Sequence, residues 1–357
     1  MLNLHFSSEI SIEDQERVGQ LSEDLLNTFG TDEKKRRSVS SIMRSLGGDF
    51  LYHFFDPLTT ELMLNPDGSV WHEKLSAPMT RFGTLQAYEA LNVLNSVADS
   101  CGKVVSHETP TLSANFPLDG SRFQGFIPPI VHSASFVMRK KARAIFSLET
   151  YVEKGGLTPS QYDEIVKAVK QRKNILVVGG TGTGKTTLMN AIIQKISQIH
   201  PYNRILTIED TEELQVQSAN RLSLFTSPTV SMDDLIRDSL RSRPDHILVG
   251  EVRGKEALSV LDAWSTGHPG GAATVHSNSA LEGLDHLAGL VTRHQDAPPY
   301  DEILKLVGTA VDVVVHIARL DGARKVKSVL YVDRYDRNER TFRYVEHFAD
   351  GQSNSNV

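Results

Sequence analysis

The C-terminal part of the chain alternates short apolar runs with segments in which apolar residues recur at helical spacing. A helix start signal opens it, with Thr158 as N-cap, Pro159 at the first helical position and Gln161 completing a capping box. The predicted strands are 175–178, 205–208, 246–249 and 272–276, and the predicted helices between and after them are 185–199, 231–241, 255–265 and 279–293. Strands that alternate with helices favour a mostly parallel sheet covered on both faces. We therefore expect an α/β domain over 158–349.

The residues before this domain carry two hairpin signals. Segments 61–65 and 70–73 flank Pro66-Asp67-Gly68, and a second hairpin turns at Asp119-Gly120. Helices are predicted at 41–55 and 84–100, and a further strand at 135–139. This pattern predicts a small α+β domain over 36–146, followed by a link at 147–157.

The two ends of the chain are predicted to lie outside these domains. Residues 1–35 carry apolar side chains at helical spacing, which predicts a helical extension that packs on another surface. The basic run 34–37 is either a solvated linker or a contact for anionic lipid or nucleic acid. The polar residues 350–357 are expected to be disordered.

Length and composition narrow the class of protein. A chain of 357 residues is too long for one compact core, and 39% apolar with 23% charged residues is an ordinary globular balance. The formal net charge of −6 argues against a dedicated duplex-DNA binder. The single cysteine, Cys101, excludes an intrachain disulfide, and no run approaches the roughly 18 apolar residues of a membrane span. Without an apolar signal core, we expect a cytoplasmic protein whose membrane contact is peripheral.

A complete phosphate-binding loop lies between the first predicted strand of the α/β domain and the helix that follows. Its residues are Gly179-Gly180-Thr181-Gly182-Thr183-Gly184-Lys185-Thr186, with Thr187 continuing into the helix. Glycines let backbone N–H groups surround the β-phosphate, and the helix N-terminus adds partial positive charge. Lys185 is predicted to reach the β- and γ-phosphates, and the Thr186 hydroxyl to take one Mg²⁺ position. The loop therefore predicts binding of ATP with Mg²⁺.

Acids at the ends of two predicted strands supply candidates for hydrolysis. Glu251 follows strand 246–249, where an acid lies beside the phosphate loop and can polarise a water molecule. The usual pattern has Asp before this Glu, but here the position is Gly250. Glu209 and Asp210 end strand 205–208, where they either form part of a solvated acidic turn or polarise water or hold the waters of Mg²⁺.

One histidine and two arginines complete the candidate set. His276 ends strand 272–276 near the same crevice, where it is either a packed structural histidine or a donor to a phosphate or to Glu251. Arg122 and Arg139 lie on the last strands of the first domain. From the residues alone, the arginines are solvated charges.

Together these residues resemble the secretion-superfamily traffic ATPases, which drive type II and type IV secretion and type IV pili. The four boxes that define this superfamily occur in order: the phosphate loop 179–186, an aspartate box 208–213, a Walker B-like box 247–254 and a histidine box 271–278. Further segments over 36–333 are similar to the conjugal transfer ATPases of the type IV secretion branch, among them Phe116–Phe123 and Val313–Arg319.

The resemblance implies a RecA-like P-loop NTPase domain preceded by a smaller, PAS-like α+β domain. In this superfamily a glycine commonly precedes the catalytic glutamate, which accounts for Gly250, and the histidine contacts the γ-phosphate region, a role that falls to His276. In the superfamily the N-terminal domain clamps the nucleotide with arginines. Arg122 and Arg139 match those positions, with Arg143 as a further candidate.

The expected function is a homohexameric ATPase at the cytoplasmic side of the inner membrane that powers type IV secretion or conjugative DNA transfer. Its expected partners are components of the inner-membrane complex, without stable sequence-specific nucleic-acid binding. A motor of type IV pili or type II secretion, and a nucleotide-gated scaffold with slow hydrolysis, remain alternatives. The net charge of −6 disfavours a nucleic-acid translocase, and no acceptor pocket supports a metabolite kinase. The transported substrate stays open.

Overall fold

The computed structural model describes residues 4–74, 77–140, 146–227, 229–320 and 322–356. The chain divides into two compact units, Met1–Arg143 and Ala144–Val357, close to the boundary at 146 that the sequence predicts. The two units are described separately below. No helix in the described part of the chain is long and apolar enough to cross a membrane.

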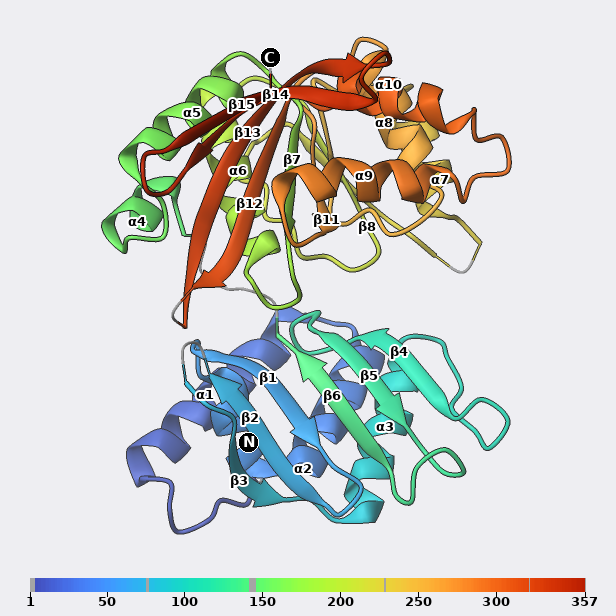
Figure 1. Ribbon diagram of the computed structural model, residues 1–357. Helices are drawn as coiled ribbons and strands as arrows, with labels where there is room; N and C mark the ends of the chain where they lie inside the picture. The colour runs from blue at the N-terminus through green and yellow to red at the C-terminus, as the bar shows by residue number, and fades with distance from the viewer. Residues whose placement is uncertain (1–3, 75–76, 141–145, 228, 321, 357) are drawn as a thin grey trace. The chain divides into compact units, whose positions relative to one another are not determined.

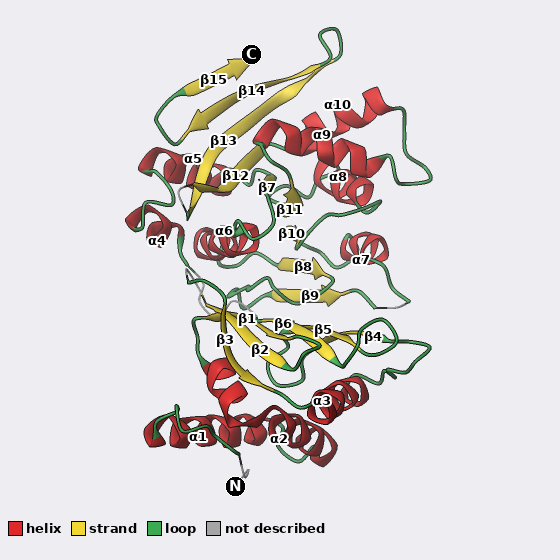
Figure 2. Cartoon of the chain, turned by 60° about the horizontal axis from the view of Figure 1, so that its bottom comes forward, coloured by secondary structure: helices red, strands yellow, loops and turns green. Residues whose placement is uncertain are grey.

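The first unit is a six-stranded antiparallel sheet with three helices on one face (Figure 2). The helices are α1 (Ile12–Thr28), α2 (Glu33–Phe55) and α3 (Ala87–Ser100). In sheet order the strands are β3 (Thr80–Thr84), β2 (Ser69–Lys74), β1 (Thr59–Leu64), β6 (Ser135–Arg139), β5 (Arg122–Phe126) and β4 (Thr111–Asn115). The β1–β2 and β4–β5 pairs confirm both predicted hairpins. The α+β class of this domain is thereby confirmed.

The N-terminal extension belongs to this unit. Val18 and Leu26 of α1 are buried in the same hydrophobic cluster as the sheet and α2, so the predicted apolar face does pack on a surface. The helix covers only 12–28 of the expected 1–35, and α2 already begins at Glu33, before the predicted domain boundary at 36. Asp32 caps α2 through its side chain, which accepts the backbone N–H of Lys35 and so sets this start.

The second unit is built on a nine-stranded sheet (Figure 1). In sheet order its strands are β15 (Ser353–Asn356), β14 (Thr341–Phe348), β13 (Ala323–Asp336), β12 (Val313–Leu320), β7 (Ile175–Gly179), β11 (Ala272–His276), β10 (His246–Val249), β8 (Ile205–Glu209) and β9 (Arg221–Phe225). From β12 to β9 all neighbours are parallel, whereas β12 to β15 form an antiparallel extension. The predicted mostly parallel sheet is therefore confirmed for the part that carries the phosphate loop.

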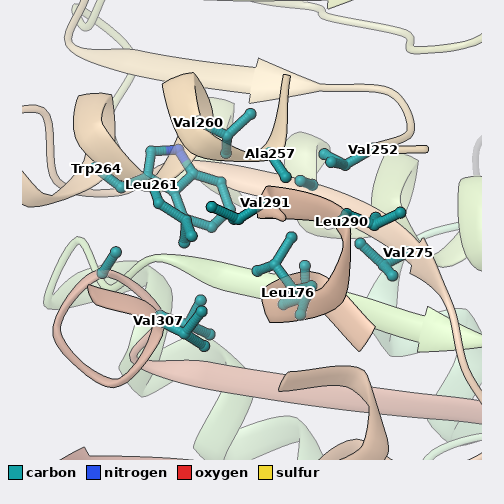
Figure 3. Packing of buried hydrophobic residues seen from close by; sticks show 14 of the residues in the cluster. Leu176, Val252, Ala257, Val260, Leu261, Trp264, Val275, Leu290, Val291 and Val307 are labelled. Atoms are coloured by element: carbon teal, nitrogen blue, oxygen red, sulfur yellow. The ribbon is translucent and has the colours of Figure 1, made fainter. Parts of the chain in front are cut away.

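Helices cover both faces of the parallel strands. One face packs against α4 (Leu148–Glu153), α5 (Pro159–Lys170) and α6 (Lys185–Ile199). The other packs against α7 (Met232–Ser239), α8 (Ala257–Ser265), α9 (Ala280–Val291) and α10 (Tyr300–Ala310). Figure 3 shows this second face, where Leu176 and Val275 of the sheet meet Leu261, Trp264 and Val307 of the helices. The strands β7, β8 and β10 are buried throughout, as strands enclosed on two faces must be.

Two segments differ from the prediction. The expected link at 147–157 contains α4, which Ser147 caps by accepting the backbone N–H of Thr150. The expected disordered tail contains β15, which pairs with β14. The prediction of a disordered tail was wrong here because Ser353–Asn356 carries no apolar pattern, and its pairing rests on backbone hydrogen bonds that a composition argument does not see.

Candidate nucleotide site

The phosphate loop has the strand–loop–helix geometry that its sequence predicts. The loop leaves the buried strand β7 at Gly179, and α6 begins at Lys185. Gly182 and Gly184 adopt φ of 70° and 95°, in the left-handed region that favours glycine. A methyl group on Gly179 would lie 2.3 Å from the Ile317 carbonyl oxygen, so no larger residue fits there. The glycines therefore serve both the turn and the close contact with β12.

Lys185 and Thr183 bind the loop to itself. Lys185 is 8% exposed, and its ammonium donates to the carbonyl oxygens of Gly179 and Gly180 at 3.0 Å each. The Thr183 hydroxyl donates to the Gly180 oxygen at 2.9 Å. Thr181 in the loop is exposed, and Thr187 in the first turn of α6 is half-buried. The cation is thus held at the mouth of the loop, where phosphate oxygens would meet it.

The strand order brings two of the predicted residues to Lys185. β11 lies between β7 and β10, so His276 at its end stands between the phosphate loop and Glu251. Lys185 Nζ lies 3.2 Å from His276 Nδ1, and His276 Nε2 lies 2.8 Å from Glu251 Oε1. The predicted base, histidine and loop lysine therefore form one continuous chain of polar contacts.

Burial and nearby charges set the protonation states of His276 and Glu251 in this chain of contacts. Burial and the nearby ammonium of Lys185 lower the pKa of His276, so the imidazole is neutral at neutral pH. A neutral imidazole that accepts from Lys185 at Nδ1 carries its proton on Nε2, facing Glu251. Burial alone would raise the pKa of Glu251, but its bond to Arg253, with the charges of Arg253, His276 and Lys185, lowers it overall. Glu251 is therefore an ionised carboxylate, as a water-polarising base must be.

Arg253 is a member of this site to which the sequence analysis gave no role. Its Nη2 bonds to Glu251 Oε2, and its Nη1 lies 3.9 Å from Asp210 Oδ2. The guanidinium thus joins the ends of β10 and β8. The available signal was its place two residues after Glu251, inside the Walker B-like box.

Glu209 lies behind the crevice. Its side chain is 2% exposed, and Oε1 accepts the backbone N–H groups of Glu213 and Leu214 at 2.9 and 2.8 Å. Burial raises the pKa of Glu209 to about 7, against the lowering effect of these two bonds. A side chain so enclosed has no exposed oxygen to hold a catalytic water. Its contacts instead fix the shape of the acidic segment that follows β8.

Glu209 also explains the glycine before Glu251. A methyl group on Gly250 would lie 3.1 Å from Glu209 Cγ and 3.3 Å from Oε1. These distances are short for a buried, hydrogen-bonded side chain. An aspartate at this position would press a second carboxylate against Glu209. The packing of β8 on β10 thus favours a glycine over the aspartate of the usual Asp-Glu pair.

The residues predicted for Mg²⁺ are arranged differently from the expectation. The Thr186 hydroxyl donates to Glu213 Oε2 at 3.3 Å. Asp210 is exposed and accepts from the Thr226 hydroxyl at 3.0 Å. In the described ranges, no group of three or more His, Cys, Asp or Glu is placed to hold a metal ion. This sparse set fits Mg²⁺, which takes few protein ligands and otherwise waters and phosphate oxygens. Glu213, the last residue of the aspartate box, is the carboxylate beside Thr186.

The two predicted clamp arginines lie together in the first unit. Arg122 on β5 and Arg139 on β6 are directly opposed in the antiparallel register. Arg139 Nε lies 4.0 Å from Glu61 Oε1, and half of the Arg139 side chain is exposed. Directly opposed residues of an antiparallel pair point to the same face, so the two guanidinium groups lie on one face of the sheet. Arg143 lies outside the described residues.

A cleft of about 760 Å³ opens beside the loop and runs along α9. Gly180, Thr181 and His276 line its inner end, and Asp285, His286 and Arg293 are among the residues that line the rest. The polar end of β11 is thus accessible from solvent.

Comparisons with known proteins identify the family. Residues 116–350 match the family described as Type II/IV secretion system protein. The chain belongs to that family. Within it, the chain is similar to the conjugal transfer protein TrbB of Rhizobium radiobacter, with 38% identity over 321 residues that cover 90% of this chain and 97% of the relative. The type IV secretion system protein VirB11 of Bartonella quintana (strain Toulouse) is 33% identical over 294 residues, covering 70% and 81%.

A solved structure supports the fold of this secretion family member. The ATPase DotB of Legionella pneumophila matches with a TM-score of 0.58 at 18% identity, covering 82% of this chain and 81% of that structure. The resemblance to the secretion-superfamily traffic ATPases, which rested on the four boxes, is confirmed by the family match.

Proposed function

We propose that this protein is a Mg²⁺-dependent ATPase that powers a type IV secretion machine for conjugative DNA transfer. The observation that carries the proposal is the contact chain from Glu251 through His276 to Lys185 beside a complete phosphate loop. The relative named as a conjugal transfer protein covers 90% of the chain, which favours conjugation over secretion of protein effectors.

Each of the three residues in this chain of contacts has a distinct part in hydrolysis. Glu251, kept ionised by Arg253, accepts a hydrogen bond from the attacking water and aligns it with the terminal phosphate. Lys185 neutralises the charge that develops on the β- and γ-phosphate oxygens. Neutral His276 keeps the carboxylate and the ammonium apart, and its Nε2–H is free to turn from Glu251 to a phosphate oxygen.

The Thr186 hydroxyl is the direct protein ligand that we assign to Mg²⁺, with Glu213 orienting it and its waters. Bound there, the ion would offset the negative charge of the phosphates. Asp210 lies beside Arg253 and, in this proposal, holds that arginine in place. Glu209 acts as a positioning residue, because its buried oxygen holds the segment that carries Glu213.

Arg122 and Arg139 are assigned to the terminal phosphate region. Their opposed positions on β5 and β6 offer two guanidinium groups to one anion. An arginine that reaches the transferred phosphate accounts for roughly 10³–10⁵-fold in rate in other phosphoryl-transfer enzymes. The proposal includes a homohexameric ring that binds components of an inner-membrane complex from the cytoplasmic side.

Turnover of the purified full-length chain tests the clamp. Arg139→Ala and Arg122→Ala should lower kcat for ATP by at least about a hundredfold. Arg81→Ala is the matched control, since it removes an exposed arginine from β3 at the far edge of the same sheet. If Arg139→Ala kept normal turnover while Glu251→Gln, assayed in parallel, was inactive, Arg139 would have no part in the clamp.

Donor cells test the biological role. Glu251→Gln should retain ATP and capture the membrane partners, so purification of this variant should recover components of the conjugation complex. DNA transfer should fail in cells that carry the variant alone. Normal DNA transfer with an inactive Glu251→Gln enzyme would favour the nucleotide-gated scaffold. Capture of pilus or type II secretion components would assign the chain to those machines instead.

A further inference from the structure

The hairpin of β12 and β13 lies against the phosphate loop on the flank opposite to His276. β7 has β11 as one neighbour and β12 as the other. A methyl group on Gly184 would lie 3.1 Å from Arg324 Cδ, and one on Gly182 would lie 3.9 Å from Arg319 Nη2. With the Ile317 carbonyl against Gly179, the hairpin meets the loop at three of its glycines.

Arg319 and Arg324 share one face of this hairpin. They are directly opposed in the antiparallel register, so their side chains leave the hairpin in the same direction. Side chains on a strand alternate, which places Arg319 on the same side as Ile317 and leaves Lys325 on the other side. The face that carries both arginines is therefore the face in contact with the phosphate loop.

In the part of the chain that the structure describes, the two arginines lack the carboxylate partners that arginines with a purely structural role commonly have. Within the described residues, neither guanidinium makes an ion pair with a carboxylate. Two opposed cations repel each other, and an anion placed between them relieves that repulsion. The only strongly anionic ligand that the adjoining loop is built to bind is a nucleotide phosphate chain.

The direction of the phosphate chain follows from the other flank. Glu251, His276 and Lys185 mark the side of β11 as the place of the terminal phosphate. The other phosphates of the nucleotide then extend across the loop toward β12. The phosphate that lies nearest to the hairpin arginines is therefore the one that joins the nucleoside.

We propose that Arg319 and Arg324 form a binding site for the α-phosphate of the nucleotide held by the same chain's phosphate loop. The proposal rests on the ATP-binding function given above and adds a second cationic contact within the same unit. Both ADP and ATP carry this phosphate, so the hairpin recognises nucleoside diphosphates and triphosphates alike. The clamp arginines Arg122 and Arg139, in contrast, are assigned to the terminal phosphate.

Calorimetric titration of the full-length chain with ADP, ATP and pyrophosphate at fixed salt tests the proposal. Arg319→Ala and Arg324→Ala should each weaken ADP and ATP by the same factor, roughly tenfold or more, as expected for a lost charge-assisted hydrogen bond. Pyrophosphate has no α-phosphate ester and should bind these variants as it binds the unmodified protein. Arg319→Lys should recover only part of the affinity, because lysine keeps the charge but not the planar fork.

The matched control is Lys325→Ala, which removes a cation from the opposite face of the same strand and should change affinity by less than about twofold. Melting curves without nucleotide show whether the variants are folded. Unchanged ADP affinity in both arginine variants would overturn the proposal, as would weaker binding of ATP alone or an equal loss for pyrophosphate.

These titrations, read together with the turnover assay, separate the α-phosphate proposal from the proposed motor function. If the unmodified protein hydrolyses ATP but Arg319→Ala and Arg324→Ala bind ADP normally, only the α-phosphate site is wrong. If ADP binding depends on these arginines but the unmodified protein has no turnover with or without its membrane partners, the α-phosphate site stands and the motor function fails.

Discussion

The two flanks of the phosphate loop carry opposite kinds of chemistry. On the β11 flank, an ionised glutamate, a neutral histidine and an ammonium are joined by contacts of 2.8 and 3.2 Å. On the β12 flank, Arg319 and Arg324 oppose each other without a carboxylate partner among the described residues. In the proposed reaction, the groups of the first flank change their contacts or their protonation. The second presents fixed positive charge, which suits binding and has no part in proton transfer.

The largest expected effect comes from a substitution on the β11 flank, called the reactive flank below. The same substitution leaves the β12 flank, called the binding flank, unchanged. Glu251→Gln keeps the shape of the side chain but removes the base, so kcat should fall by about 10²–10⁴-fold. ADP affinity should stay within about threefold, because the loop and the hairpin arginines are unchanged. Steady-state turnover and calorimetry on the same preparation provide both values. Substantial remaining turnover would mean that another acid on this flank activates the water.

The next effect concerns how the reactive flank is packed. Gly250→Ala places a methyl group 3.1 Å from the buried side chain of Glu209, and the resulting overpacking should lower the free energy of unfolding by about 1–3 kcal/mol. Gly289→Ala is the matched control: it lies in α9, where an added methyl meets nothing within 4 Å, and should be neutral or slightly stabilising. Urea unfolding of both variants measures the difference. Equal stability would show that Glu209 moves aside freely.

The elements of the reactive flank were predictable from the chain, because each of them carries a local signal. Strands 246–249 and 272–276 have the predicted bounds, since enclosed parallel strands are short continuous apolar runs. The acid and the histidine that follow them fall at the carboxyl ends of those strands. Their meeting with Lys185 depends only on strand order, which the alternating pattern already restricts.

The binding flank was not predictable in the same way. Arg319 lies in a segment that is similar to other family members, but no local pattern distinguishes it or Arg324 from other surface arginines. Their position at the loop depends on the register of β12 with β13 and on β12 lying next to β7, contacts between residues far apart in the chain. Likewise, Glu209 carries the pattern of an exposed strand-end acid, and only its burial shows that it faces inward. Neither the strand register nor the burial of Glu209 can be inferred from composition or from the periodicity of apolar residues.

Glu209 gives a third, pH-dependent effect. Its pKa is raised to about 7 in the folded protein, above the ordinary value near 4.5. The stability connected with its neutral form is therefore complete below about pH 4.5 and is lost as the pH rises through 7. Glu209→Gln stays neutral, so relative to the unmodified protein it should gain up to about 3 kcal/mol between pH 5 and pH 8. Glu212→Gln, at an exposed position of the same segment, should show only a small trend, because the charge of Glu212 makes a minor contribution to the raised pKa of Glu209. A parallel pH dependence for both variants would mean that Glu209 is ionised in the folded state.

The smallest expected effect tests how the reactive flank is connected to the loop. His276→Gln should lower kcat by about tenfold, because an amide replaces the imidazole between Lys185 and Glu251 less accurately. The sign of the pH dependence is more informative than the size. Lys185 and burial lower the pKa of His276, so the unmodified enzyme should lose activity on the acid side as the imidazole gains a proton and can no longer accept from Lys185. Arg253 and His286 also favour the neutral form, whereas Glu251 favours the charged one.

In His276→Gln this acid loss should shrink to the part that comes from protonation of Glu251, whose pKa is also lowered. His286→Gln is the matched control, because it removes an exposed imidazole that lines the same cleft without contacting Lys185 or Glu251 through any described hydrogen bond or ion pair. Its pH–rate profile should keep the acid loss of the unmodified enzyme, moved only slightly to higher pH, because His286 makes a minor contribution to lowering the pKa of His276. If His276→Gln also kept the full acid loss, the titrating group would be Glu251 alone. The histidine would then serve to position the carboxylate, and the difference between the two flanks would rest on the acid by itself.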